Sequence, residues 1–212
     1  NVFALPKHSK LPESNAIILD SANKSKRLLS LEELNILCEN SHCNAKKLEE
    51  LQHRLPSLIN EANVELLDIN DYEMPIYSSD LEEVHGIPDA ASRFVNKIAQ
   101  ADALLISFAE HNGNYTAAYK NLLDWCSRLD RNIYQHKPML LLATSPGQGG
   151  GSTVLGMAAT AAPFFAGTVV GTLSIPGFNE NFDTGRGTLT NATLAQELSE
   201  LIEKLRAALQ TQ

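Results

Sequence analysis

The segment Ser145–Gly150 has the composition best suited to bring backbone atoms against a ligand. In the string TSPGQGGGS, four of the five positions from Gly147 to Gly151 are glycine. Ordering such a loop costs about 1 kcal/mol per glycine relative to alanine, so packing alone is a poor explanation for it. The loop lacks the lysine of a GxxxxGK phosphate loop and does not fit the GxGxxG dinucleotide fingerprint. It predicts close backbone approach to a ligand, with a flexible linker as the alternative.

A second segment, Glu110–Asn114, predicts a tight turn that presents backbone N–H and C=O groups outward. Asn112, Gly113 and Asn114 favour positive φ. Such a turn can hydrogen-bond the edge of a flat heterocycle without using side chains. The alternative is an ordinary strand-to-helix connection in which Asn114 caps the helix.

Both segments directly follow apolar runs that predict buried strands. These runs are continuous rather than alternating, as expected of strands covered on both faces: Val64–Ile69, Ala103–Phe108, Met139–Ala143 and Thr168–Ile175. Segments with helical spacing separate or follow them: Pro88–Gln100, Tyr115–Leu129, Gly151–Phe165 and Thr193–Leu209. The pattern predicts an α/β chain with a parallel sheet and helices on both faces. Ligands bind such sheets at the carboxyl ends of the strands, where both segments fall.

Two of these helices carry further signals. Thr193 with Gln196 offers a capping box, and the leucine stripe that follows should pack on the sheet. In Tyr115–Leu129, apolar residues spread over more than one narrow stripe, which predicts a second buried face that includes Trp125. The alternative is that Trp125 covers the edge of its own core.

The first 62 residues are less regular. Either Ala16–Leu19 or Val2–Leu5 can form the first strand, because each is an apolar run followed by a polar turn. The segment Leu31–Asn60 predicts two helices or one broken helix. Cys38, His42 and Cys43 lack the paired spacing of a structural zinc site, so we expect packing or surface roles and no metal.

Composition limits the classes of partner. The chain of 212 residues has a net charge of −8, which opposes binding to nucleic acid. No run approaches the ~20 apolar residues of a membrane helix, and the first residues lack the features of a secretion signal. Three cysteines fit free thiols in a reducing compartment. We expect a cytoplasmic protein without a membrane partner, built as one domain with an irregular elaboration within residues 1–62.

Four segments in order along the chain resemble the flavodoxin-like NAD(P)H-dependent FMN reductase family: VELLDINDYEMPIYSSDLE, ADALLISFAEHNGNYTAAYKNLLDWCSR, KPMLLLATSPGQGGG and FNENFD. The resemblance spans about residues 63–183. It implies a doubly wound five-stranded parallel sheet, non-covalent FMN, and NAD(P)H as electron donor. It also implies a small acceptor, such as a quinone, an azo compound, a metal ion or a free flavin. It further implies a homodimer or homotetramer, with the helix Tyr115–Leu129 and its Trp125 at a subunit interface.

The resemblance assigns site residues position by position. The loop that contacts the flavin ring comprises Glu110, His111, Asn112, Gly113 and Asn114, with Ala109 and His111 standing where the family often has Pro and Tyr. The second flavin loop comprises Ser145, Pro146, Gly147, Gln148, Gly149 and Gly150. A third segment borders the flavin: Met74, Pro75, Ile76 and Tyr77. Hydride transfer between NAD(P)H and a flavin needs no catalytic side chain, so none is assigned.

The phosphate loop is the place where the sequence departs from the family pattern. The best match for it is Ser21, Asn23 and Ser25, with Lys26 and Arg27 beside them. The alternative set is Ser9, Ser14 and Asn15, while Ser41 and Asn44 resemble only the entry to the following helix. The alternative function is a flavodoxin-type electron carrier or a flavin-binding module, either of them without NAD(P)H turnover.

Two polar groupings have simpler interpretations. Asp124 and Arg128 have the i,i+4 spacing of an ion pair on one helix. Glu82 and Glu83 predict a solvated face rather than a carboxylate pair that handles protons.

Overall fold

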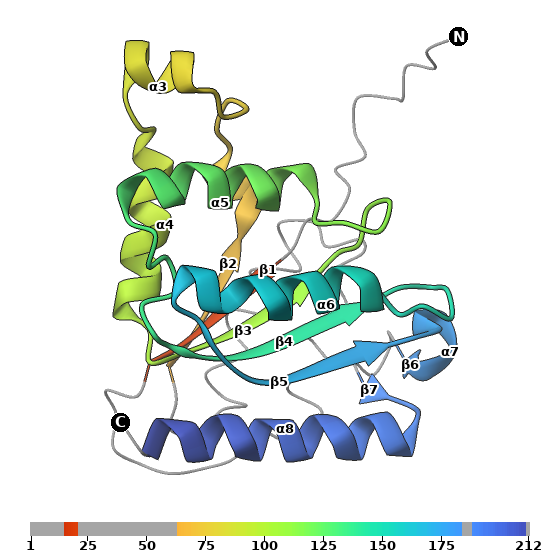
Figure 1. The fold of residues 1–212 in the computed structure, drawn as a ribbon. Helices are drawn as coiled ribbons and strands as arrows, with labels where there is room; N and C mark the ends of the chain where they lie inside the picture. The colour runs from red at the N-terminus through yellow and green to blue at the C-terminus, as the bar shows by residue number, and fades with distance from the viewer. Residues whose placement is uncertain (1–14, 21–62, 184–187, 211–212) are drawn as a thin grey trace, which may run out of the picture.

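A central sheet with the strand order β2-β1-β3-β4-β5 organises the computed structural model, which describes residues 15–20, 63–183 and 188–210 (Figure 1). Each strand begins within one residue of the position predicted from the apolar runs. Their bounds are β1 Asn15–Asp20, β2 Asn63–Asp68, β3 Ala103–Phe108, β4 Pro138–Thr144 and β5 Thr168–Ile175. The predicted α/β chain with a parallel sheet is confirmed for β3, β4 and β5, which pair in parallel.

β1 corrects the prediction of a wholly parallel sheet. It runs antiparallel to both of its neighbours, β2 and β3. An apolar run buried on both faces carries no information about direction, because parallel and antiparallel ladders both pair every backbone group. Since β2 and β3 each oppose β1, they point the same way, and β2 to β5 all end at one edge of the sheet. We call this edge the carboxyl edge.

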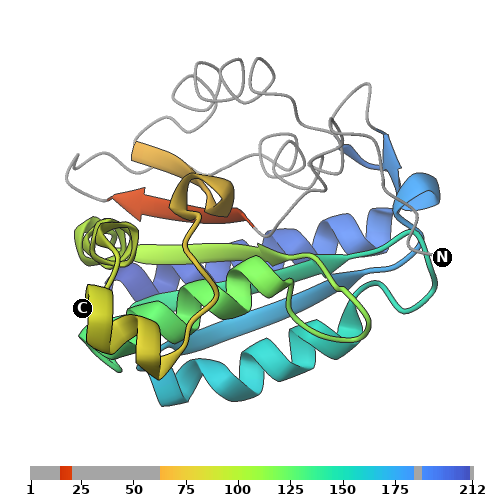
Figure 2. The same ribbon diagram turned by 90° about the horizontal axis from the view of Figure 1, so that it is seen from above.

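Helices cover both faces of the sheet (Figures 1 and 2). One face packs against α4 Asp89–Gln100, α5 Ala117–Leu129 and α6 Ser152–Ala161, and the other against α8 Ala192–Gln210. Alternate residues of β3 divide between the two cores: Leu104 and Ile106 contribute to the first, Ala103 and Leu105 to the second. The stripe of α8 is buried at Leu198, Ile202 and Leu205, as expected of a helix that packs its apolar face on the sheet.

Short elements complete the described part of the chain. They are η2 Ile69–Tyr72, α3 Ser79–His85, η3 Ala162–Phe165, α7 Phe178–Asn181, β6 Phe182–Asp183 and β7 Thr188–Leu189. The predicted helix 151–165 is two elements, because Pro163 at the beginning of η3 cannot continue the hydrogen-bonding of α6. Among the described residues, no helix combines the length and apolarity needed to cross a membrane.

Two helix caps differ from those predicted. The hydroxyl of Thr116, not Asn114, caps α5 by accepting from the N–H of Tyr119. The side chain of Asn191 caps α8 by accepting from the N–H groups of Thr193 and Leu194. In both cases the capping residue directly precedes the helix, and the predicted residue lies two positions away from it.

Trp125 lies in the core of its own chain, so its predicted place at a subunit interface is wrong. Only 1% of its surface is exposed, and Leu122, Leu123 and Cys126 beside it are also buried. The additional apolar face of α5 packs against α4 and the segment after β2, which belong to the same molecule. Leu129, the last residue of α5, is exposed.

Candidate functional site

The loops that follow β3, β4 and β5 meet at the carboxyl edge. The loop after β4 is fixed to the residues after β5, because the N–H groups of Gly177 and Phe178 donate to the carbonyl oxygens of Gly147 and Ser145, each at 3.0 Å. It is fixed to the loop after β3 by Glu110, whose carboxylate accepts from the N–H of Val154 at 2.9 Å. The structure therefore brings together the two segments that the sequence singles out for ligand binding.

The first of these segments contains a tight turn at its tip. His111 and Asn114 exchange two backbone hydrogen bonds, of 3.0 and 3.1 Å, across Asn112 and Gly113. Both central residues have positive φ, 53° and 73°, which is the pattern of a type I′ turn and explains the Asn-Gly pair. The predicted positive-φ turn is confirmed. His111, Asn112 and Asn114 are exposed, so the tip is accessible.

The glycines of the second segment divide into two kinds. Gly150 and Gly151 have positive φ, and a Cβ on either would collide with the protein itself. At Gly150 it would meet Ser174 Oγ and Pro176 N, and at Gly151 it would lie 2.9 Å from Ala143 Cβ. These two glycines therefore serve close packing of the loop against β4 and β5, a role that the sequence argument discounted.

Gly147 and Gly149 differ from these two packed glycines. Both are exposed, and a Cβ at Gly149 would meet nothing within 4 Å. The backbone here is open to an approaching flat group, with no side chain of its own in the way. These two positions are where the loop after β4 has room for a flat ring, such as that of the flavin that the resemblance implies.

The third predicted segment, Met74–Tyr77, is fixed to α5 rather than to these loops. The Asn121 carboxamide accepts from the N–H of Tyr77 at 2.8 Å and donates to the carbonyl oxygens of Met74 and Pro75, each at 3.1 Å. Ile76 is 83% exposed. Asn121 lies five residues beyond the cap Thr116, about 7.5 Å along the helix axis. Sequence reasoning missed Asn121; the signal was a single amide beside the buried leucines of the same helix.

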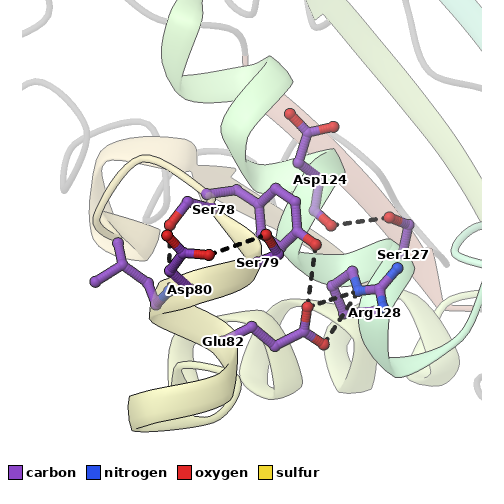
Figure 3. A network of polar contacts seen from close by, with 9 residues as sticks. Ser78, Ser79, Asp80, Glu82, Asp124, Ser127 and Arg128 are labelled. Atoms are coloured by element: carbon purple, nitrogen blue, oxygen red, sulfur yellow. Dashed lines mark hydrogen bonds and ion pairs between the residues drawn. The ribbon is translucent and has the colours of Figure 1, made fainter.

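A polar network next to this segment joins α3 to α5 (Figure 3). Arg128 Nε lies 2.9 Å from Glu82 Oε2, and the hydroxyl of Tyr77 donates to the same oxygen at 3.0 Å. The predicted Asp124–Arg128 pair is thus wrong: Arg128 reaches Glu82, while Asp124 pairs with Lys120 at 2.6 Å. The hydrogen bond to Glu82 raises the pKa of Tyr77. Glu82 is a link between helices rather than only a solvated charge.

Behind the first loop lies a cluster of aromatic rings. Phe108 contacts Tyr115 and Tyr119, with ring centroids 5.8 and 5.2 Å apart. The hydroxyls of Tyr119 and Tyr134 are hydrogen-bonded at 2.7 Å, and both residues are buried. Burial raises the pKa of both hydroxyls. This cluster gives the loop a rigid base.

Cys126 is a packing residue. Its side chain is buried, and burial raises the pKa of the thiol to about 12. A thiol of this kind remains protonated at neutral pH and is a poor nucleophile.

The predicted phosphate-loop residues lie outside the described part of the chain, except Asn15. Strand β1, which lies between the two candidate sets, is described. Asp20 pairs with Asn63, the first residue of β2, so β1 ends at the edge opposite the two loops. Asn15, from the alternative set, pairs with Ser107 and Asp68 at the carboxyl edge. The other candidates outside the described residues are Val2–Leu5, Leu31–Asn60, Cys38, His42 and Cys43.

Comparisons with known proteins identify relatives of this chain. A protein from Arabidopsis thaliana named NADPH:quinone oxidoreductase is 36% identical over 88 residues, which cover 42% of this chain and 43% of that protein. An NAD(P)H-dependent FMN reductase of Pseudomonas aeruginosa is 36% identical over 88 residues, which cover 42% of this chain and 46% of that protein. The chain thus spans less than half the length of these curated relatives.

A solved structure has the same fold over a longer stretch. FerB, a flavoenzyme NAD(P)H:(acceptor) oxidoreductase from Paracoccus denitrificans, superposes with a TM-score of 0.51 and 25% identity, over 68% of this chain and 79% of that chain. The family model described as NADPH-dependent FMN reductase matches residues 38–180, a range that contains β2 to β5 and both loops. The chain therefore belongs to the NADPH-dependent FMN reductase family.

Proposed function

We propose that this chain is an FMN-dependent NAD(P)H oxidoreductase that passes reducing equivalents through one bound flavin to a small acceptor. The observation that carries the proposal is the junction of two backbone-rich loops at the carboxyl edge, joined by Glu110 and Val154. In open α/β sheets this edge is where ligands bind. Membership of the family supports the same assignment.

Each loop has a separate part in the proposed site. The exposed backbone at Gly147 and Gly149 accommodates a flat ring, and N–H groups there can stabilise negative charge on it. The turn Asn112–Gly113 offers further backbone groups to the edge of the ring. The flavin, when bound, supplies the hydride chemistry. The remaining task of the protein is to hold the ring and a nicotinamide in contact, for which no acid or base is needed.

A quinone is the acceptor that we propose first. Relatives from Arabidopsis thaliana and Escherichia coli are named NADPH:quinone oxidoreductase and quinone reductase. A quinone is flat and can stack on the same face of the flavin from which the nicotinamide departs. Azo compounds, metal ions and free flavins are the other acceptors to be compared.

We further propose that the chain is one flavodoxin-like domain that assembles as at least a homodimer, through α6 and η3. The segment 152–165 carries no charged residue. Its residues Met157 and Phe164 are exposed, and Phe164 has 65% of its surface accessible. An exposed apolar surface of this kind is typical of an interface. Since α6 begins where the second loop ends, a partner on this face would border the proposed flavin site.

The test of the function is anaerobic mixing of the FMN-incubated protein with NADPH and, separately, NADH. Loss of the flavin absorbance within seconds, and its return on adding a quinone, support the oxidoreductase. A protein that binds FMN but is not bleached by either nucleotide would instead be an electron carrier. A matched variant, Gly149→Ala, should weaken FMN binding without unfolding the protein, because the added methyl enters open space.

A further inference from the structure

Glu110 belongs to the loop after β3, but its carboxylate lies at the beginning of α6, the helix after β4. Oε2 accepts from the N–H of Val154 at 2.9 Å. Val154 is the third residue of α6, and the third N–H of a helix is one that an N-cap side chain normally satisfies. Glu110 therefore caps α6 from a distant part of the chain.

The residue at the N-cap position explains why the cap comes from elsewhere. Gly151 occupies that position with φ 73° and makes no side-chain cap. A Cβ there would lie 2.9 Å from Ala143 Cβ, so no serine, threonine or aspartate can be accommodated. The close packing of α6 on β4 removes the local cap, and the carboxylate of Glu110 replaces it.

If the proposed function holds, the negative charge of this cap affects the reduction potential of the bound flavin. The amino end of a helix carries roughly half a positive charge. This partial positive charge, directed at the flavin, would stabilise the negative charge that reduction adds to the ring. The carboxylate of Glu110 is bound at this same helix end and offsets its positive charge.

We propose that Glu110 is a positioning residue that acts through α6. Its hydrogen bond holds the loop after β3 and the loop after β4 in a fixed relative position, and its charge keeps the reduction potential of the bound flavin low. A low potential favours onward transfer of electrons to the acceptor. The carboxylate oxygen of Glu110, as a hydrogen-bond acceptor, sets the relative position of the loops, and its negative charge lowers the reduction potential of the flavin. The two contributions can be separated by substitution.

Glu110→Gln retains an oxygen that can accept from Val154 but removes the charge, whereas Glu110→Ala removes both. Glu197→Gln, on the exposed side of α8, is the control for loss of one negative charge elsewhere. The measurements are the FMN dissociation constant, the flavin midpoint potential by spectroscopic titration, and the melting temperature of the FMN-free protein.

We expect Glu110→Gln to melt slightly below the wild type, because the end of α6 loses its counter-charge. It should bind FMN as the wild type does, with a more positive potential. The shift should be on the order of tenfold in the equilibrium constant, ~30 mV for a two-electron couple. Glu110→Ala should lower the melting temperature and weaken FMN binding, and Glu197→Gln should change none of the three.

An unchanged potential in Glu110→Gln would overturn the inference, as would losses of stability and binding equal to those of Glu110→Ala. A wild-type protein that binds no FMN would count against the proposed function instead. In that case the melting temperatures still decide whether Glu110 caps α6.

Discussion

The indole N–H of Trp125 donates to the carbonyl oxygen of Pro75, with 2.7 Å between nitrogen and oxygen. The same carbonyl accepts from the Asn121 side chain, and the ring of Trp125 packs edge-on against Tyr77 with centroids 5.0 Å apart. One face of α5 thus holds the segment after β2 through both polar and aromatic contacts. Trp125 is an internal anchor of this segment and not part of a subunit interface.

Replacing Asn121 by alanine should release this segment. Three hydrogen bonds are lost, and we expect the free energy of unfolding to fall by ~2–3 kcal/mol, because partly buried backbone groups lose their partners. Urea denaturation measures the change. Asn121→Asp retains the acceptor for the N–H of Tyr77 but sets a carboxylate oxygen against the carbonyl oxygens of Met74 and Pro75, so it should be no more stable than the alanine variant. Equal stability of Asn121→Ala and wild type would show that the clamp contributes nothing.

The two kinds of glycine in the second loop should respond differently to alanine. Gly150→Ala should destabilise the protein by about 2 kcal/mol or more, because its positive φ and its contacts with Ser174 and Pro176 both oppose a Cβ. Gly149→Ala should leave stability nearly unchanged and raise the FMN dissociation constant on the order of tenfold.

Gly156→Ala is the matched control for the added methyl. It also enters open space, in the interior of α6, and should stabilise the protein by about 1 kcal/mol. Thermal melts and FMN titrations of the three variants distinguish the roles. A Gly149→Ala protein that binds FMN as tightly as wild type would remove that glycine from the proposed site.

The sequence was sufficient to locate the elements but not all of their partners. Continuous apolar runs placed β2 to β5 and offered Ala16–Leu19 as one of two candidates for β1, whereas the short strands β6 and β7 were not predicted. The Asn112–Gly113 pair predicted the turn, because turns and apolar runs both depend on local chemistry. The direction of β1, the capping of α6 by Glu110 and the clamp by Asn121 depend on contacts between distant residues. The Asp124–Arg128 pairing failed for the same reason: spacing along one helix does not show that Glu82 of another helix offers Arg128 a better partner.

The buried hydroxyl pair Tyr119–Tyr134 should show strong coupling. Changing either residue to phenylalanine leaves the other hydroxyl without its partner at 2.7 Å, and we expect a loss of ~1–3 kcal/mol. The double variant Tyr119→Phe with Tyr134→Phe should be nearly as stable as wild type, because neither unpaired hydroxyl remains. A double-mutant cycle in urea measures the coupling, and additive effects would contradict it.

The same pair predicts a loss of stability at alkaline pH. Burial raises the pKa of both hydroxyls in the folded state, so above the ordinary tyrosine pKa of about 10 the unfolded chain releases protons that the folded protein keeps. The contribution of these two hydroxyls to the free energy of unfolding should be constant below about pH 10 and should fall above it. The free energy of unfolding of the double phenylalanine variant should fall less steeply than that of the wild type between about pH 10 and 12.

Assembly should depend on α6 and η3 rather than on α5. Phe164→Glu places a charge on the exposed apolar surface and should convert a homodimer into a monomer, as light scattering would detect. Val84→Glu, at another exposed apolar residue, on α3, should leave the assembly intact. A wild-type protein that is monomeric at micromolar concentration would refute the proposed assembly.

The most direct measurement for the proposed function is stopped-flow absorbance of the purified, FMN-incubated protein mixed anaerobically with NADPH. We expect a yellow protein whose flavin absorbance disappears within seconds and returns when a quinone is added. A protein that binds no FMN at high micromolar concentration, or whose bound flavin stays oxidised with both NADPH and NADH, would contradict it.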